Sequence, residues 1–117
     1  QYAFSFPERL PLQGERLDLF AQQKLEFFKP DVQRFRCLGL AYEAIERGGN
    51  MSCILNAANE VVNEAFRNNL CSFPDMARTI EATMAATTFE AQPSLEALLQ
   101  TDAEARAIAR ELLGATK

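Results

Sequence analysis

The chain has 117 residues, of which 48% are hydrophobic, and its formal net charge is −4. This length and hydrophobic content predict a single small folded protein and exclude an intrinsically disordered chain. The acidic balance, with few and scattered basic residues, excludes a nucleic-acid-binding surface. No apolar run reaches the roughly 18 residues of a transmembrane helix and no signal peptide is visible, so we expect a cytoplasmic protein without a membrane partner.

The sequence lacks the residues that most enzyme sites need. It contains no histidine, which removes the usual general base near neutral pH, the commonest metal ligand and any Ser-His-Asp triad. No glycine-rich phosphate loop or calcium loop is present. Cys37, Cys53 and Cys71 are widely spaced and form no CxxC pair, which favours free thiols over a metal or redox site. We therefore predict no catalytic, cofactor-binding or metal-binding residue in this chain.

Residues 1–33 are predicted to form an extended, aromatic-rich arm. Six of the nine phenylalanines lie at or before Phe35, and prolines and a glycine interrupt any long element. The stretch "KLEFF" allows a short strand. So many phenylalanines predict contact with a surface, either the chain's own helices or a domain outside this sequence. Because the first residue is Gln rather than Met, we expect a processed product or a piece of a longer protein.

Residues 34–117 are predicted to form a second unit, an all-α domain of about four helices. The first helix spans about 34–47 and stops at "GG". The second and third span about 51–68 and 74–87, the latter started by "SFPD". Short linkers predict that the helices pack as a small antiparallel bundle. The inner positions expected for the first and third helices are Leu38, Ala41, Ala44 and Ile45, and Met76, Ala77, Ile80 and Met84.

The fourth helix is predicted to begin after Pro93, with Ser94 as its N-cap. Thr101 and Glu104 have the spacing of a second capping box, so a break or kink is expected at "QTDAE". The apolar positions on either side of this point keep one helical face. They are Leu98, Ala105, Ile108 and Leu112.

The second helix, "CILNAANEVVNEAF", contains three asparagines, although Asn is roughly 0.6 kcal/mol less favourable than Ala inside a helix. A helical projection gives an apolar face of Ile54, Leu55, Ala58, Val61, Val62, Ala65 and Phe66. Asn56 and Asn63 lie opposite, and Asn59 lies at the boundary. In one interpretation Asn56 and Asn63 are simply solvated while Asn59 bonds a neighbouring loop or helix end. In the other, the asparagine row contacts a partner domain or borders an active site. Glu60 and Glu64, one turn apart, resemble paired acids of di-iron bundles, but those use Glu-x-x-His motifs, so a metal is disfavoured.

Several strings occur in the order found in a known enzyme family. They are "FPERL", "LDLF", "LEF", "PDVQRFRCLGLAYEAIERGG", "LNAANEVVNEAF" and "PSLEALLQTDAEAR". Together they resemble the C-terminal portion of 1-deoxy-D-xylulose-5-phosphate reductoisomerase over nearly the whole chain. Arg36 stands where the family usually has Pro, and Ser52-Cys53 replaces a common Pro-Ala. Both departures are expected to change local capping rather than the fold.

The resemblance implies an enzyme of non-mevalonate isoprenoid synthesis. Such an enzyme converts 1-deoxy-D-xylulose 5-phosphate to 2-C-methyl-D-erythritol 4-phosphate with NADPH and Mg²⁺ or Mn²⁺, and a homodimer is expected. In the family the dinucleotide fold, metal carboxylates and substrate-binding residues precede the portion that corresponds to this chain, so none is assigned to a position here. This portion is implied to be a connecting arm and a helical domain that supports the catalytic domain. The alternative is a free-standing helical interaction module.

Overall fold

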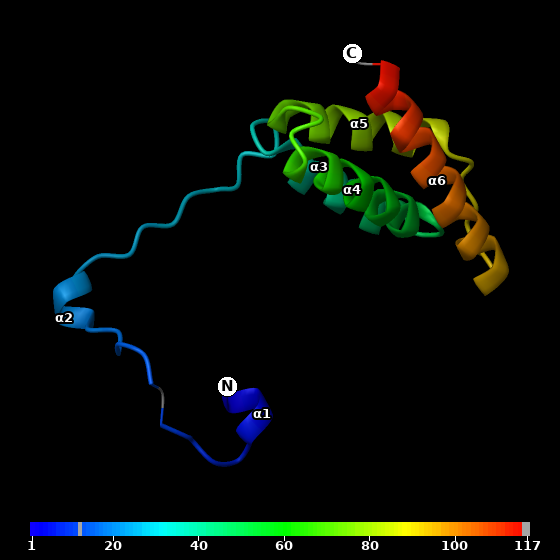
Figure 1. Ribbon diagram of the computed structural model, residues 1–117. Coiled ribbons are helices and arrows are strands. Elements are labelled where there is room, and N and C mark those ends of the chain that lie inside the picture. Colours follow the sequence, from blue (N-terminus) through cyan, green and yellow to red (C-terminus); the bar gives the residue numbers. More distant parts are fainter. Residues whose placement is uncertain (12, 116–117) are drawn as a thin grey trace.

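Helices are the only regular secondary structure in the residues that the computed structural model describes, 1–11 and 13–115. Two single-turn helices come first, followed by four longer ones (Figure 1). No strand occurs in the described ranges, so the short strand considered at "KLEFF" is wrong. No helix among these residues is long and apolar enough to cross a membrane. The helices are α1 (Tyr2–Ser5), α2 (Leu19–Gln22), α3 (Arg36–Arg47), α4 (Met51–Arg67), α5 (Phe73–Ala86) and α6 (Leu95–Ala115).

Helix α4 contacts each of α3, α5 and α6, and α5 also contacts α3 and α6. These four helices are gathered on one side of the molecule in Figure 1. Their apolar side chains recur at helical spacing and meet in one core, whose burial drives the packing. Four of the core residues are alanines of α4 and α6, and such small side chains let helix backbones approach closely. The core consists of Leu40, Ala44, Met51, Ile54, Ala57, Ala58, Val61, Val62, Ile80, Met84, Ala105 and Ala109.

The helix ends follow the local signals in the sequence. Helix α3 ends at Gly48 and Gly49, which have φ angles of +67° and +57°, as the predicted glycine stop requires. Helix α5 begins after Ser72, whose backbone N–H donates to the Asp75 carboxylate at 2.8 Å. Helix α6 begins after Ser94, whose Oγ accepts from the Ala97 N–H at 3.1 Å. The predicted stop of α3 and the predicted start signals of α5 and α6 are therefore confirmed.

The break predicted inside the last helix is wrong, because α6 is continuous from Leu95 to Ala115. The two residues expected to cap a new helix there bind other parts of the chain instead. Thr101 Oγ1 accepts from Asn50 Nδ2 at 3.1 Å, and Glu104 Oε1 accepts from the Thr88 N–H at 3.4 Å. The polar pair that suggested a break thus anchors α6 to the turn between α3 and α4 and to the loop between α5 and α6.

Three side chains predicted to be buried are exposed. Ile45 is 72% exposed and Leu38 37%, although both were placed on the inner face of α3. Ala44, which was also predicted to be buried, is 2% exposed, and the remaining buried place is taken by Leu40, at 1%, which was not predicted. Phe66 is 39% exposed and packs edge-to-face on Phe73, with ring centroids 5.8 Å apart. Helix α3 therefore has two apolar sides, only one of which faces the core.

Residues 1–11 and 13–33, which we call the N-terminal segment, extend away from the four long helices (Figure 1). Asp18 caps the short helix α2 by accepting from the Phe20 and Ala21 N–H groups. The phenylalanines of this segment make little contact with the rest of the chain, and Phe4, Phe20 and Phe27 are 98%, 92% and 90% exposed.

Candidate functional site

The three asparagines of α4 face solvent. Asn56, Asn59 and Asn63 are all exposed. Asn56 Nδ2 donates to Glu60 Oε1, its neighbour one turn on, at 3.1 Å. No side-chain hydrogen bond of Asn59 or Asn63 is found in the described part of the chain, so the loop or helix-end contact expected for Asn59 is not present there. The simpler interpretation holds for Asn56 and Asn63, which lie on the outer face of the helix.

Glu60 of α4 forms an ion pair with Arg106 of α6. Arg106 Nη2 donates to Glu60 Oε2 at 2.6 Å, and Arg106 Nε donates to Asp102 Oδ2 at 2.7 Å. Hydrogen bonds from Arg106 and then Asn56 lower the pKa of the Glu60 carboxyl, and the two carboxylates raise the pKa of Arg106. Because the guanidinium already occupies Glu60, the carboxylate serves to join α4 to α6.

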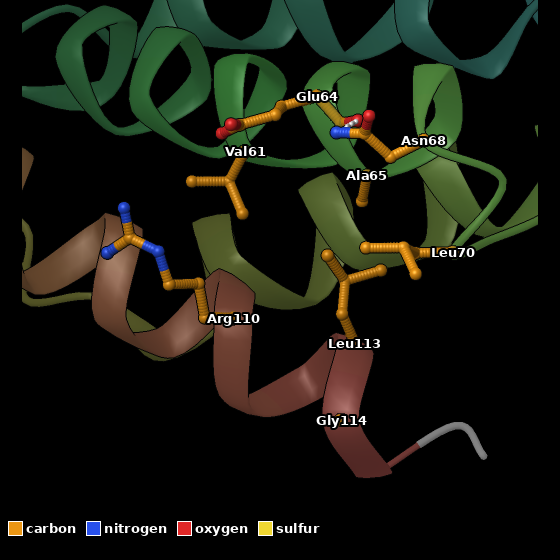
Figure 2. A pocket seen from close by; sticks show the side chains of 8 residues that line it. All are labelled: Val61, Glu64, Ala65, Asn68, Leu70, Arg110, Leu113 and Gly114. Atoms are coloured by element: carbon orange, nitrogen blue, oxygen red, sulfur yellow. Dashed lines mark hydrogen bonds between the residues drawn. The ribbon is translucent and has the colours of Figure 1, made fainter.

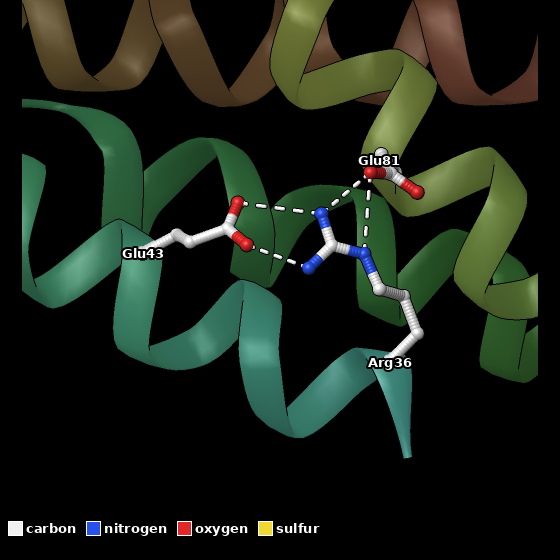
Figure 3. Close-up of polar contacts among 3 residues, drawn as sticks. All are labelled: Arg36, Glu43 and Glu81. Carbon is white, nitrogen blue, oxygen red and sulfur yellow. Dashed lines mark hydrogen bonds and ion pairs between the residues drawn. The ribbon is translucent and has the colours of Figure 1, made fainter. Parts of the chain in front are cut away.

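A second arginine joins α3 to α5. Arg36 Nη1 donates to Glu43 Oε1 at 2.6 Å and Arg36 Nη2 donates to Glu81 Oε1 at 2.5 Å, as Figure 3 shows. The hydrogen bonds of Glu81 and then Glu43 raise the pKa of Arg36, and that of Arg36 lowers the pKa of Glu81. Arg36 is the residue at which the sequence analysis noted a departure from the resembled family. That departure was expected to change local capping, and the structure shows Arg36 in this bridge between helices.

Asn50, which the sequence did not single out, is a deeply buried polar side chain. It is 1% exposed and its backbone N–H donates to the Glu90 carbonyl at 3.0 Å. Its side chain donates to the Thr88 carbonyl at 2.9 Å and to Thr101 Oγ1, and accepts from the Glu90 N–H at 2.9 Å. We call these contacts the Asn50 clamp. They join the α3–α4 turn to the α5–α6 loop and to α6.

The local sequence around Asn50 is an asparagine directly after two glycines and before a helix. That position predicts an N-cap. The Asn50 side chain makes no capping hydrogen bond to its own helix, and its partners lie 38 to 51 residues further along the chain. Such partners cannot be read from local sequence.

The cysteines are free thiols. Cys37 is exposed, whereas Cys53 and Cys71 are partly buried. Burial raises the pKa of the Cys53 and Cys71 thiols, which keeps them protonated and poorly nucleophilic. Residues 1–11 and 13–115 bring no group of three or more His, Cys, Asp or Glu side chains together in a way that could hold a metal ion.

Two surface grooves border the long helices. The first, of about 270 Å³, lies between α4 and the end of α6, with Val61, Ala65 and Leu113 directed into it and Glu64 and Arg110 at its edges (Figure 2). The second groove has a volume of about 410 Å³ and lies where α3 and α5 begin. Its lining is mainly apolar with arginines at the edge, and includes Arg34, Phe35, Phe73, Pro74, Met76 and Arg78.

The described surface is thus rich in exposed apolar side chains, and the two arginines that lie between helices, Arg36 and Arg106, are each paired with two carboxylates. A family model described as the DXP reductoisomerase C-terminal domain matches residues 1–108. The chain belongs to this family. Among curated proteins, the 1-deoxy-D-xylulose 5-phosphate reductoisomerases of Bacteroides fragilis and Bacteroides thetaiotaomicron are 51% and 52% identical to it over 113 residues. Each match covers 97% of this chain and 29% of the relative, so the chain spans less than a third of their length.

Solved structures of DXP reductoisomerases also match. The enzyme from Zymomonas mobilis in complex with NADPH is 36% identical with a TM-score of 0.79, and the match covers 96% of this chain and 30% of that one. A crystal structure of DOX-P reductoisomerase in complex with magnesium gives a TM-score of 0.84 at 30% identity, over 99% of this chain and 31% of that one. The 99% coverage means that the N-terminal segment is part of the match as well as the long helices.

Proposed function

We propose that this chain is the C-terminal part of an NADPH-dependent reductoisomerase that converts 1-deoxy-D-xylulose 5-phosphate to 2-C-methyl-D-erythritol 4-phosphate. The observation that carries the proposal is the family match over residues 1–108. The curated relatives with the same match share one name, and we take the activity from that name. Because similar structures are described as complexes with NADPH and with magnesium, we assign NADPH and a divalent ion, Mg²⁺ or Mn²⁺, to the complete enzyme. A cytoplasmic location stays a prediction.

In this proposal the reaction takes place on the part of the enzyme that precedes these residues. The described side chains do not fit a divalent ion, because their carboxylates do not converge in groups of three. No GxGxxG loop is available for a pyrophosphate. No catalytic, cofactor-binding or metal-binding role is therefore given to any residue of this chain.

The role we assign to residues 34–117 is mechanical support of the catalytic domain by an antiparallel four-helix bundle. The Arg36–Glu81 and Arg106–Glu60 ion pairs and the Asn50 clamp each join elements that are distant in sequence, and they tie the four long helices to one another. Residues 1–33 are assigned as the connecting arm, since their exposed phenylalanines need an apolar surface outside this chain. The partner is the preceding part of the same polypeptide, and the complete enzyme is proposed to be a homodimer.

The proposal is tested on the complete protein. Substrate-dependent oxidation of NADPH in the presence of Mg²⁺ or Mn²⁺ is expected, and its absence would favour the free-standing interaction module. Deleting residues 34–117 should abolish turnover because the remaining protein is unstable, which light scattering and circular dichroism would detect. A truncated enzyme that stayed folded but bound substrate poorly would place this domain at the active site.

The assignment of the chemistry has its own test. Residues 1–117 alone should show no reductoisomerase activity, and calorimetric titration with NADPH or Mn²⁺ should show no saturable binding. The same titrations of the complete enzyme provide the positive control. Saturable micromolar binding of either ligand to residues 1–117 would contradict the assignment, and the exposed asparagine row of α4 would then be the first place to look.

A further inference from the structure

Helix α3 carries an apolar stripe that no part of the described structure covers. It consists of Phe35, Leu38, Tyr42 and Ile45, which are 57%, 37%, 55% and 72% exposed. Their spacing of three, four and three residues places them on one side of the helix. The core-facing side of α3 is a different one, formed by Leu40 and Ala44. The stripe is therefore additional to the surface that the bundle needs for its own packing.

The outer face of α4 provides a comparison within the same molecule. Its exposed positions Asn56, Asn59, Glu60 and Asn63 are polar, and the large apolar side chain that it exposes, Phe66 at 39%, packs on Phe73 of α5. A polar outer face is what a helix in contact with water requires, whereas a contiguous apolar face marks an interaction site. The contrast between the two neighbouring helices indicates that α3, unlike α4, faces another protein surface.

The stripe is continuous with other exposed apolar groups. Phe35 connects it to the N-terminal segment, which carries Phe20 and Phe27 at 92% and 90% exposure. Phe35 also borders the groove of about 410 Å³, in which Phe73 of α5 is 71% exposed. The apolar surface of α3 thus extends onto the start of α5, at the end of α3 where the N-terminal segment joins it in the chain.

We propose that the α3 stripe is the surface on which the catalytic portion of the same polypeptide packs. The inference rests on the proposed function, because it takes the covering part to be the rest of a reductoisomerase. The relatives are about three times as long as this chain, and the family model is described as their C-terminal domain, so a large preceding portion is available. The preceding portion would be tethered to α3 through the N-terminal segment. Because of this tether its effective concentration beside α3 is high, whereas a second copy of the chain has no such advantage.

Cysteine accessibility in the complete protein tests this placement. The variant is Ile45→Cys, and the matched control is Asn63→Cys on the polar face of α4. Maleimide labelling of each site is followed by peptide mass spectrometry, so that native cysteines are counted separately. We expect residue 45 to react at least ~10-fold more slowly than residue 63 in the native protein and equally fast in urea, because an interface excludes the reagent. Equal rates in the native protein would overturn the proposal.

A photo-crosslinker identifies what covers the stripe. Replacing Tyr42 with p-benzoylphenylalanine keeps an aromatic ring at that site, and irradiation should join residue 42 to peptides that precede Gln1 within one chain. A product of twice the chain mass would assign the stripe to a second copy, and a product with an unrelated protein would assign it to an external partner. Either would overturn the proposal. NADPH-dependent turnover by the unmodified protein is measured separately. If the enzyme is active but residue 45 reacts as fast as residue 63, only the proposed surface is refuted. If residue 45 is protected from labelling but the protein is inactive, only the proposed function is refuted.

Discussion

The two consecutive glycines after α3 allow a sharp test of the packing, because they share one backbone feature and differ in surroundings. Gly48 and Gly49 both have positive φ angles, of +67° and +57°. A Cβ at Gly48 would meet nothing within 4 Å. A Cβ at Gly49 would collide with the Glu90 carbonyl oxygen and lie 3.0 Å from the Ala91 Cα. The perturbation is Gly49→Ala, with Gly48→Ala as its matched control.

The expected magnitudes follow from these surroundings. At Gly48 only backbone strain is added, because φ +67° with ψ −149° is a region that essentially only glycine occupies, and this costs about 1–3 kcal/mol. At Gly49 the left-handed conformation costs about 1–2 kcal/mol for an alanine. Moving residues 89–91 to make room adds about 1–3 kcal/mol. That movement also strains the hydrogen bond from the Asn50 N–H to the Glu90 carbonyl, so we expect Gly49→Ala to cost about 1–2 kcal/mol more than Gly48→Ala.

Urea unfolding followed by far-ultraviolet circular dichroism gives the free energy of unfolding of each variant. Gly114→Ala in α6 serves as a second control, since a Cβ there meets nothing within 4 Å and the helical position favours alanine. It should be neutral or stabilising by up to about 1 kcal/mol. Equal losses for Gly48→Ala and Gly49→Ala would refute the argument that residues 89–91 pack directly on Gly49.

Three further outcomes are expected from the same assay. Ile54→Ala truncates a fully buried side chain and should lower the free energy of unfolding by about 2–5 kcal/mol. Asn63→Ala on the exposed face of α4 should be neutral or slightly stabilising. A large loss of stability at Asn63 would show that the asparagine row makes structural contacts. Asn50→Asp removes two donated hydrogen bonds and buries a carboxylate, so it should lower the free energy of unfolding by about 3 kcal/mol or more. Thr101→Val removes only one acceptor of Asn50 and should cost about 1 kcal/mol. Similar small losses for both variants would contradict the Asn50 clamp. Hydrogen bonds from the Ser72 hydroxyl, Arg78 and the Ser72 N–H lower the pKa of Asp75 from 3.8 to about 2, so its stabilising contribution is complete above pH 3.8 and is lost as the pH falls toward 2. Asp75→Asn should reduce that part of the acid sensitivity, and an unchanged pH profile of the urea midpoint would contradict the assignment.

The sequence determined the number and type of the long helices because the signals involved are local. Apolar spacing and helix stops act over three or four residues, which is the range of helix hydrogen bonds and capping contacts. The glycine stop after α3 and the Ser72–Asp75 start of α5 were therefore predictable. The family could be identified for a related reason, since a string such as "LNAANE" combines core positions and polar positions at a fixed spacing.

Other features were decided only by the tertiary structure. Thr101 and Glu104 have the spacing of a cap, but Asn50 and Thr88 use them as acceptors, and the helix continues through them. The identity of such partners depends on which loop packs against which helix, and a local pattern does not contain it. The tertiary context overrode a local signal that was otherwise correct.

Periodicity also failed to select the buried side of α3, because the predicted inner positions combined Leu38 and Ile45 with Ala44. Helical spacing groups Leu38 with Ile45 and separates them from Leu40 and Ala44, yet all four are apolar and each group can form a core face. Only the positions of α4 and α5 select the second group. The sequence thus determined four amphipathic helices and their ends, whereas the tertiary structure decided which faces they bury among themselves, because burial depends on neighbours that lie far away along the chain.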